Sequence, residues 1–158
     1  MKKIFLLLSL TLTFLITGCS SVQTVTPLER SQMRTATLEG NYRTTFKSLM
    51  TTLENEGYTI ENTDMDSGLI KASIMKNAVG KWDTILLGTT GVAKKSLSST
   101  VTKINNTTTR VRINIREETE THQGVYDYSN VNEINDPLAY KELFNKLRVE
   151  IARYKAMK

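Results

Sequence analysis

The chain has 158 residues, with 21 lysines and arginines against 16 aspartates and glutamates, and it contains one cysteine. This length suits a single domain that can bury a hydrophobic core. A lone thiol excludes internal disulfides and thiolate metal clusters, and the modest positive charge does not by itself indicate a nucleic-acid partner.

The first eighteen residues have the three parts of a secretory signal. Met1–Lys3 is a positively charged start, Ile4–Ile16 is an apolar run, and Gly18 is a small residue at the expected cleavage site. The run is too short for a membrane-spanning helix, which needs roughly 20 apolar residues. We expect residues 1–18 to be removed. Loss of the two lysines leaves 19 basic residues against 16 acidic ones, a formal charge of about +3.

The cysteine directly follows the signal, in the string Ile16-Thr17-Gly18-Cys19. This string resembles a bacterial lipobox. The resemblance implies that the Cys19 thiol receives a diacylglyceryl group, that a peptidase cuts after Gly18, and that the new amine takes a further acyl chain such as palmitate. Each buried CH₂ contributes about 0.8 kcal/mol, so two or three chains make release from the membrane negligible. The alternative is an ordinary signal peptide that contains a cysteine.

The residue after the cysteine bears on which membrane holds the anchor. In enterobacterial lipoproteins an aspartate there favours the inner membrane, whereas this chain has Ser20. The resemblance therefore implies an anchor in the outer membrane, on its periplasmic face. The following stretch has no hydrophobic period and contains Pro27. We expect residues 19–31 to be the lipidated start and a flexible tether spanning on the order of 20 Å, and residues 32–158 to form one domain.

The first half of that domain is expected to contain short strands and one helix. Residues 33–39 have the composition of a strand. A helix follows, because Asn41 is a good N-cap and Gly57 suits the position just past a helix end. Its apolar face would consist of Tyr42, Phe46, Leu49, Met50 and Leu53. A second strand is predicted to open with Tyr58 and Ile60, followed by a turn over residues 64–68. A third strand follows, with Ile70, Ala72 and Ile74 on one side.

The second half carries the clearest strand pattern. Residues 97–104 and 109–116 are predicted to pair as a hairpin that turns at Asn105-Asn106. One side of the second strand is apolar, with Val111, Ile113 and Ile115, and the other side is polar, with Arg110, Arg112, Asn114 and Arg116. Residues 77–96 are interrupted by three glycines and are interpreted as a long loop. Residues 119–135 are interpreted as a polar connection.

The last element is a helix that begins at Asp136-Pro137, because aspartate is a good N-cap and proline is favoured at the first helical position. Its apolar stripe would consist of Tyr140, Leu143, Phe144, Leu147, Ile151 and Tyr154. A sheet with one apolar face needs a cover, which two amphipathic helices can supply. The sequence therefore predicts an α+β fold, with an antiparallel sheet of about four strands and two amphipathic helices packed on one face.

This order of elements resembles the helix-grip modules of small envelope lipoproteins, such as the C lipoprotein of the outer-membrane β-barrel assembly machinery. The segments that carry the resemblance are Phe46–Leu53, Glu56–Ile60, Asp66–Ile70 and Thr109–Ile115. The resemblance implies a small α+β protein of the envelope. Such lipoproteins often carry two modules, and this chain has room for one.

Residue types that often carry catalysis lack the partners they need. His122 is the only histidine, and it is interpreted as a solvated loop residue. The run from Asp64 to Gly68 is explained better by a hairpin turn than by a calcium loop, because Met75 stands where the bidentate glutamate would be. A group of acids is interpreted as a solvated strand end, and consists of Glu117, Glu118 and Glu120. We therefore expect no enzyme activity, no cofactor and no metal.

Two features are candidate partner surfaces. Arg110, Arg112 and Arg116 would share one sheet face, where guanidinium groups suit carboxylates and phosphates, although a simple solvated face is the alternative. Trp82 belongs to the apolar segment 82–92, which either contacts a partner or folds back onto the core.

The expected function is a lipid-anchored, non-catalytic interaction or accessory module of the cell envelope. Its partners would be the membrane, through the lipid on Cys19, and an envelope protein or an anionic lipid, but not nucleic acid. The alternative is a carrier or chaperone of a hydrophobic ligand such as a lipid. A continuous apolar pocket would favour the carrier, and a filled core with an exposed arginine face would favour the interaction module.

Overall fold

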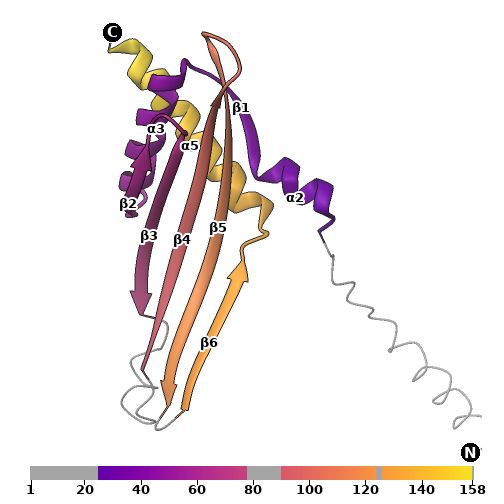
Figure 1. The fold of residues 1–158 in the computed structure, drawn as a ribbon, viewed down its shortest axis with the longest axis vertical. Coiled ribbons are helices and arrows are strands. Elements are labelled where there is room, and N and C mark those ends of the chain that lie inside the picture. The colour runs from indigo at the N-terminus through magenta and orange to yellow at the C-terminus, as the bar shows by residue number, and fades with distance from the viewer. Residues whose placement is uncertain (1–24, 78–89, 124–125, 158) are drawn as a thin grey trace, which may run out of the picture.

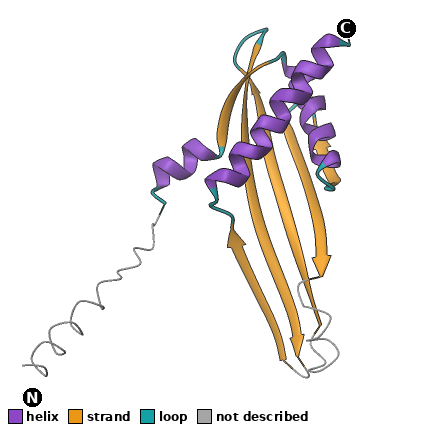
Figure 2. Ribbon diagram, turned by 180° about the vertical axis from the view of Figure 1, so that it is seen from behind, coloured by secondary structure: helices purple, strands orange, loops and turns teal. Residues whose placement is uncertain are grey.

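In the computed structural model, which describes residues 25–77, 90–123 and 126–157, the chain forms an antiparallel sheet with helices on one face (Figures 1 and 2). The strand order is β1-β5-β4-β3-β2, and β6 also pairs with β5. Among the described residues no helix has the length and hydrophobicity to cross a membrane. The elements are α2 (Pro27–Met33), β1 (Thr35–Glu39), α3 (Tyr42–Asn55), β2 (Thr59–Asp64), β3 (Leu69–Asn77), β4 (Thr90–Lys103), β5 (Thr108–Gln123), β6 (Tyr126–Glu133) and α5 (Pro137–Ala156).

The α+β class is as expected, but the predicted count of about four strands and two helices is wrong. The described residues hold six strands and three helices. β6 was interpreted as part of a polar connection because all eight of its side chains are exposed, so no alternation of apolar and polar residues marks it. The start of β4 falls in the region interpreted as a long loop, because glycines interrupt the apolar residues there. There β4 begins at Thr90 and β3 extends to Asn77, while residues 78–89 of that region lie outside the described residues.

The additional helix is α2, which lies in the stretch interpreted as the end of a tether. Its signal is a capping box: the Thr26 hydroxyl accepts a hydrogen bond from the Glu29 backbone, and the Glu29 carboxylate accepts one from the Thr26 backbone. Pro27 stands at the first helical position, where it costs no hydrogen bond. Residues 27–31 of the expected tether are therefore helical.

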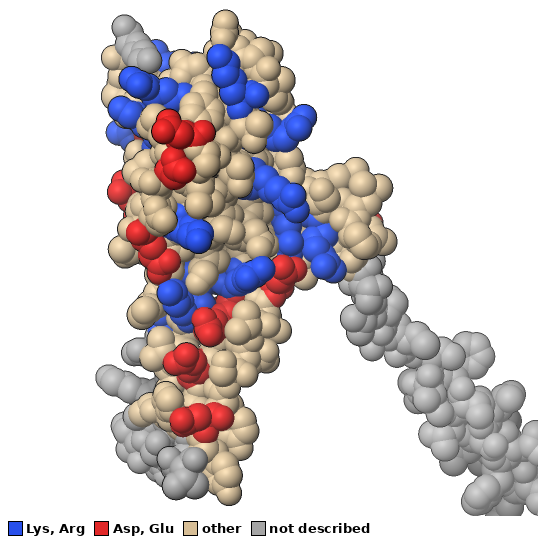
Figure 3. Space-filling model, viewed as in Figure 1, with Lys and Arg blue, Asp and Glu red and all other residues tan. Residues whose placement is uncertain are grey.

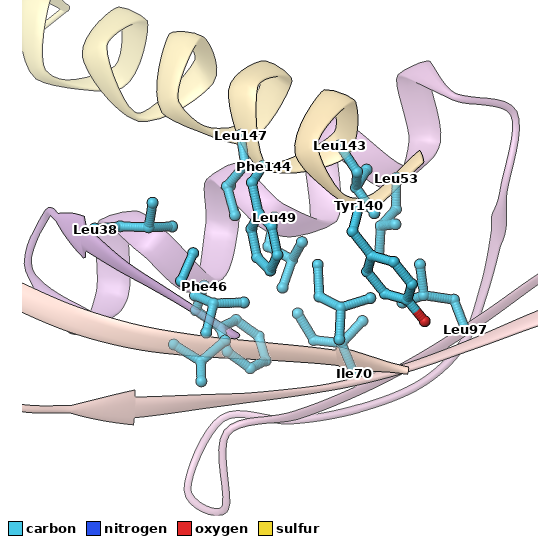
Figure 4. Close-up of a cluster of buried hydrophobic side chains, with 14 of the residues drawn as sticks. Leu38, Phe46, Leu49, Leu53, Ile70, Leu97, Tyr140, Leu143, Phe144 and Leu147 are labelled. Carbon is cyan, nitrogen blue, oxygen red and sulfur yellow. The ribbon is translucent and has the colours of Figure 1, made fainter. Parts of the chain in front are cut away.

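α3 and α5 pack against each other and against one face of the sheet (Figure 2). Their starts follow the predicted caps, because Asn41 Oδ1 accepts from the Thr44 amide at 2.8 Å and Asp136 Oδ1 accepts from the Leu138 amide at 2.9 Å. Figure 4 shows the side chains that fill the space between helices and sheet. They are fully or almost fully buried, and include Leu38, Phe46, Leu49, Leu53, Ile70, Leu97, Tyr140, Leu143, Phe144 and Leu147.

One edge of β5 is shared by two strands from opposite ends of the chain. β1 pairs with the first part of β5, up to Arg112, and β6 pairs with the last part, from Arg116 onward. The buried Tyr140 hydroxyl fills the gap between them. It accepts from the Ile115 amide at 3.1 Å and donates to the Ile134 carbonyl at 3.1 Å. The backbone groups of β5 thus stay hydrogen-bonded in the short interval between its pairing with β1 and its pairing with β6.

The ends of β3, β4, β5 and β6 continue past the region that the helices cover (Figure 2). Several apolar side chains on this extension are exposed, namely Met75, Val92, Tyr126, Tyr128 and Val131. The domain therefore has a helix-covered part with the core and a sheet extension that none of the described helices covers.

Candidate functional site

The sheet face opposite the helices is the outer face, and it is polar and basic. It faces the viewer in Figure 3, where Lys and Arg gather over the upper and middle part while the charges at the lower end are Asp and Glu. The face follows from strand alternation. Val111, Ile113 and Ile115 are buried beneath the helices, so the residues between them point outward. The sequence predicted this division of β5 correctly.

Arg110 and Arg112 are exposed on the outer face and stand beside threonines of both neighbouring strands. Arg110 is opposite Thr37 of β1 and Thr102 of β4. Arg112 is opposite Thr35 of β1 and Thr100 of β4. Together with α2 these side chains line a depression of about 670 Å³, which we call the arginine depression. Its lining consists of Ser31, Gln32, Thr35, Thr100, Thr102, Arg110 and Arg112.

The arginine depression carries an uncompensated positive charge. Within the described residues, neither Arg110 nor Arg112 takes part in an ion pair, and the other lining groups are hydroxyls and one amide. Two guanidinium groups two residues apart on one strand face stand roughly 7 Å apart along the strand. Such a pair suits an anion with several oxygens, because each guanidinium can donate two parallel hydrogen bonds.

Arg116 belongs to a different group, so the predicted row of three arginines divides. Its Nη2 lies 3.9 Å from Glu133 Oε1, while Glu133 Oε2 lies 3.1 Å from Arg34 Nη2 and 3.9 Å from Arg30 Nη1. The hydrogen bond and charge of Arg34 lower the pKa of the Glu133 carboxyl, with smaller effects from the other two arginines. This cluster is internally paired and fastens α2 to the end of β6.

Two predicted site residues, Cys19 and Trp82, lie outside the described residues. Their assigned roles, lipid attachment and partner contact, stay predictions. The apolar segment to which Trp82 belongs ends within β4, where Val92 is 43% exposed.

His122 has a partner on the neighbouring strand that the sequence does not predict. It lies in β5 rather than in a loop, and its Nδ1 is 2.7 Å from Asp127 Oδ1 of β6. The hydrogen bond and charge of Asp127 raise the pKa of the imidazole above 6.5. Both side chains are more than half exposed. Because both side chains are open to solvent and belong to paired strands, we interpret the pair as a cross-strand contact of the sheet extension.

The Asp64–Gly68 segment is a hairpin turn, as predicted. Asp64 Oδ1 accepts hydrogen bonds from the amides of Asp66 at 2.9 Å and Ser67 at 3.3 Å. A hydrogen bond from the Ser67 side chain, and after it these two backbone bonds, lower the pKa of the Asp64 carboxyl. The carboxylate thus has a structural role in the turn.

No protein-family model matches this chain, and no curated protein matches it either. The function must therefore be inferred from the chain's own residues, of which the arginine depression is the strongest candidate site.

Proposed function

We propose that this protein is a lipid-anchored, non-catalytic module of the cell envelope that binds an anionic partner through the outer face of its sheet. The observation that carries the proposal is the arginine depression. Arg110 and Arg112 are exposed there without an ion-pair partner among the described residues, on a sheet face that α3 and α5 leave open. Charged groups arranged in this way give an interface its specificity and its rate of association.

The packing of the core supports this function over that of a hydrophobic carrier. The space between the helices and the sheet is occupied by buried side chains of one continuous cluster (Figure 4). Two smaller depressions, of about 410 and 170 Å³, are lined in part by charged side chains such as Arg148 and Glu142. A lipid carrier would need a larger and mainly apolar cavity.

The anchor belongs to the proposal and has its own test. Cells that express wild type or Cys19→Ala are labelled with an alkyne fatty acid, and the protein is examined for label and for size. We expect label on the wild type in the outer-membrane fraction, and an unlabelled, uncut precursor for the variant. Equal labelling of the two proteins would refute the anchor.

The binding face is tested with two variants that each lose three positive charges. One is Arg110→Gln, Arg112→Gln, Arg116→Gln on the outer face, and its control on the helices is Lys47→Gln, Lys141→Gln, Lys155→Gln, all at exposed positions. Each protein is purified from envelopes in mild detergent, and the co-purified proteins and lipids are identified by mass spectrometry.

We expect components that wild type and the control retain, that the outer-face variant loses, and that fade with added salt, because salt screens exposed charges. Thermal melts should be close to wild type for both variants, since exposed charges contribute little to stability. Equal recovery by both variants would contradict a binding role for the outer face.

A further inference from the structure

We propose that the arginine depression binds the phosphate of an anionic lipid headgroup in the membrane that holds the protein's own anchor. This inference rests on the proposed function and names its partner. It follows from the chemistry of the lining, from the place of α2 in it, and from the length of chain between α2 and Cys19.

The lining has the groups that hold a phosphate. Arg110 and Arg112 supply two guanidinium groups, and Thr35, Thr100 and Thr102 supply hydroxyl donors beside them. Charge-assisted hydrogen bonds of this kind are the strong ones in proteins, and arginine is favoured where a phosphate is bound through two oxygens. All seven lining residues are polar. A protein partner normally inserts aromatic or aliphatic anchors among similar side chains at an interface centre, and no aromatic or aliphatic residue lines this depression.

The depression includes part of the chain that leads to the anchor. Ser31 and Gln32 of α2 form one side of it. α2 is held to the domain at its end, where the Arg34 guanidinium bonds to Glu133 at 3.1 Å and to Asn135 at 2.9 Å. The position of α2 beside the arginines is therefore fixed by the fold.

The remaining connection is short. Only residues 20–26 lie between Cys19 and the first residue of α2. Seven residues span at most about 25 Å when fully extended. A lipid on Cys19 would therefore keep α2, and the depression beside it, close to the headgroup layer. The anionic groups present there at high local concentration are lipid phosphates, which is why we choose a headgroup over a free anion or a protein.

The first experiment measures headgroup binding directly. The full mature chain in a neutral detergent is followed by NMR, through the amides of Thr100 and Thr102, while a lipid is added. The probes are dihexanoyl phosphatidylglycerol, dihexanoyl phosphatidylcholine and inorganic phosphate. The test variant is Arg110→Gln, Arg112→Gln. Its matched control is Lys71→Gln, Lys94→Gln, which removes the same charge from the same face outside the depression.

We expect phosphatidylglycerol to shift the NMR signals of these amides in wild type and control. Its affinity for the test variant should be lower by a factor of about ten or more, because hydrogen bonds to charged groups are lost. Phosphatidylcholine should bind weakly, since its choline cancels the charge. Equal binding of phosphatidylglycerol to wild type and test variant would overturn the proposal. Inorganic phosphate binding as tightly as phosphatidylglycerol would overturn the choice of a lipid as the source.

The second experiment uses the anchor. In lipidated protein Cys19 is blocked, so Thr37→Cys, at an exposed position next to the depression, gives a single thiol for a nitroxide label. The protein is placed in vesicles of phosphatidylcholine alone or with phosphatidylglycerol. We expect the label to become less accessible to a water-soluble relaxation agent only in the anionic vesicles, and only with both arginines present.

The two proposals fail separately. A protein recovered by wild type and lost by the outer-face variant, together with no response to phosphatidylglycerol, would preserve the binding module and reject the headgroup. Equal acyl labelling of wild type and Cys19→Ala would reject the anchor, while the NMR titration would still decide whether the depression binds a headgroup.

Discussion

Arg34 Nη2 lies 3.1 Å from Glu133 Oε2, although ninety-nine residues separate the two in the chain. Arg34 is only 6% exposed, and it follows the last residue of α2, while Glu133 is the last residue of β6. The pair thus joins the two segments that share one edge of β5. Its position explains how a short N-terminal helix is held against a domain to which it contributes no buried side chain.

Replacement of Arg34 by Met should destabilise the domain while preserving much of the side chain's packing. Hydrogen bonds to charged groups contribute about 1.5–3 kcal/mol, and we expect a loss of that order in the free energy of unfolding, measured by urea denaturation. Arg30→Met is the matched control, because Arg30 is more exposed and 3.9 Å from the same carboxylate. Equal losses for both variants would show that the Arg34 contact is not special.

Tyr140→Phe should be costly although it removes a single oxygen. The hydroxyl is the partner of both the Ile115 amide and the Ile134 carbonyl at the junction along β5. A buried backbone group left without a partner costs about 1–3 kcal/mol, so we expect a clear fall in the denaturation midpoint. Tyr128→Phe, at an exposed position, should stay within about 0.5 kcal/mol of wild type. A midpoint for Tyr140→Phe that matches this control would contradict the bridging role.

Gly68 and Gly57 both have positive φ, at +76° and +84°, but they meet different surroundings. A Cβ on Gly68 would lie 2.1 Å from the Val101 carbonyl oxygen, whereas one on Gly57 would meet only the Ile74 Cδ1 atom at 3.3 Å. Gly57→Ala should therefore show backbone strain of about 1 kcal/mol. Gly68→Ala must also displace a strand, and we expect about 2–4 kcal/mol. Thermal melts of the two variants compare them directly, and similar values would argue against the close approach.

The His122–Asp127 pair predicts a pH dependence confined to the sheet extension. The imidazole pKa is raised in the folded protein, so the pair stabilises the fold below about pH 6.5 and this contribution is lost as pH rises through the folded-state pKa. NMR titration of the imidazole should give a pKa above 6.5 in wild type and a lower one in Asp127→Asn. An unchanged pKa in that variant would show that Asp127 is not the cause.

Those elements with one buried face could be predicted from sequence. α3 and α5 were found because a cap precedes an apolar stripe, and Phe46 and Phe144 lie in the core as their spacing predicts, at 1% and 4% exposure. β6 was missed because it buries no face, so its polar sequence looks like a loop. The capping box formed by Thr26 and Glu29 is the local sequence signal from which α2 could be predicted.

Only part of the candidate site could be predicted from the sequence. The alternation along β5 predicts that Arg110 and Arg112 lie on the outer face. It does not predict that Arg116 belongs to a separate group. That division depends on Glu133, which reaches Arg116 through the register of β6, and on α2 closing one side of the depression. Contacts between distant segments have no local pattern, so no periodicity could reveal them.

The sharing of one β5 edge by β1 and β6 has a consequence for local unfolding. β6 pairs with β5 alone among the described strands, and all its side chains are exposed, so it should open at a lower free energy than the helix-covered strands. Each opening would withdraw Glu133 from Arg34 and loosen the start of β1. The amides of β1 should therefore exchange with solvent in step with those of β6, although the two strands never touch the same residue of β5.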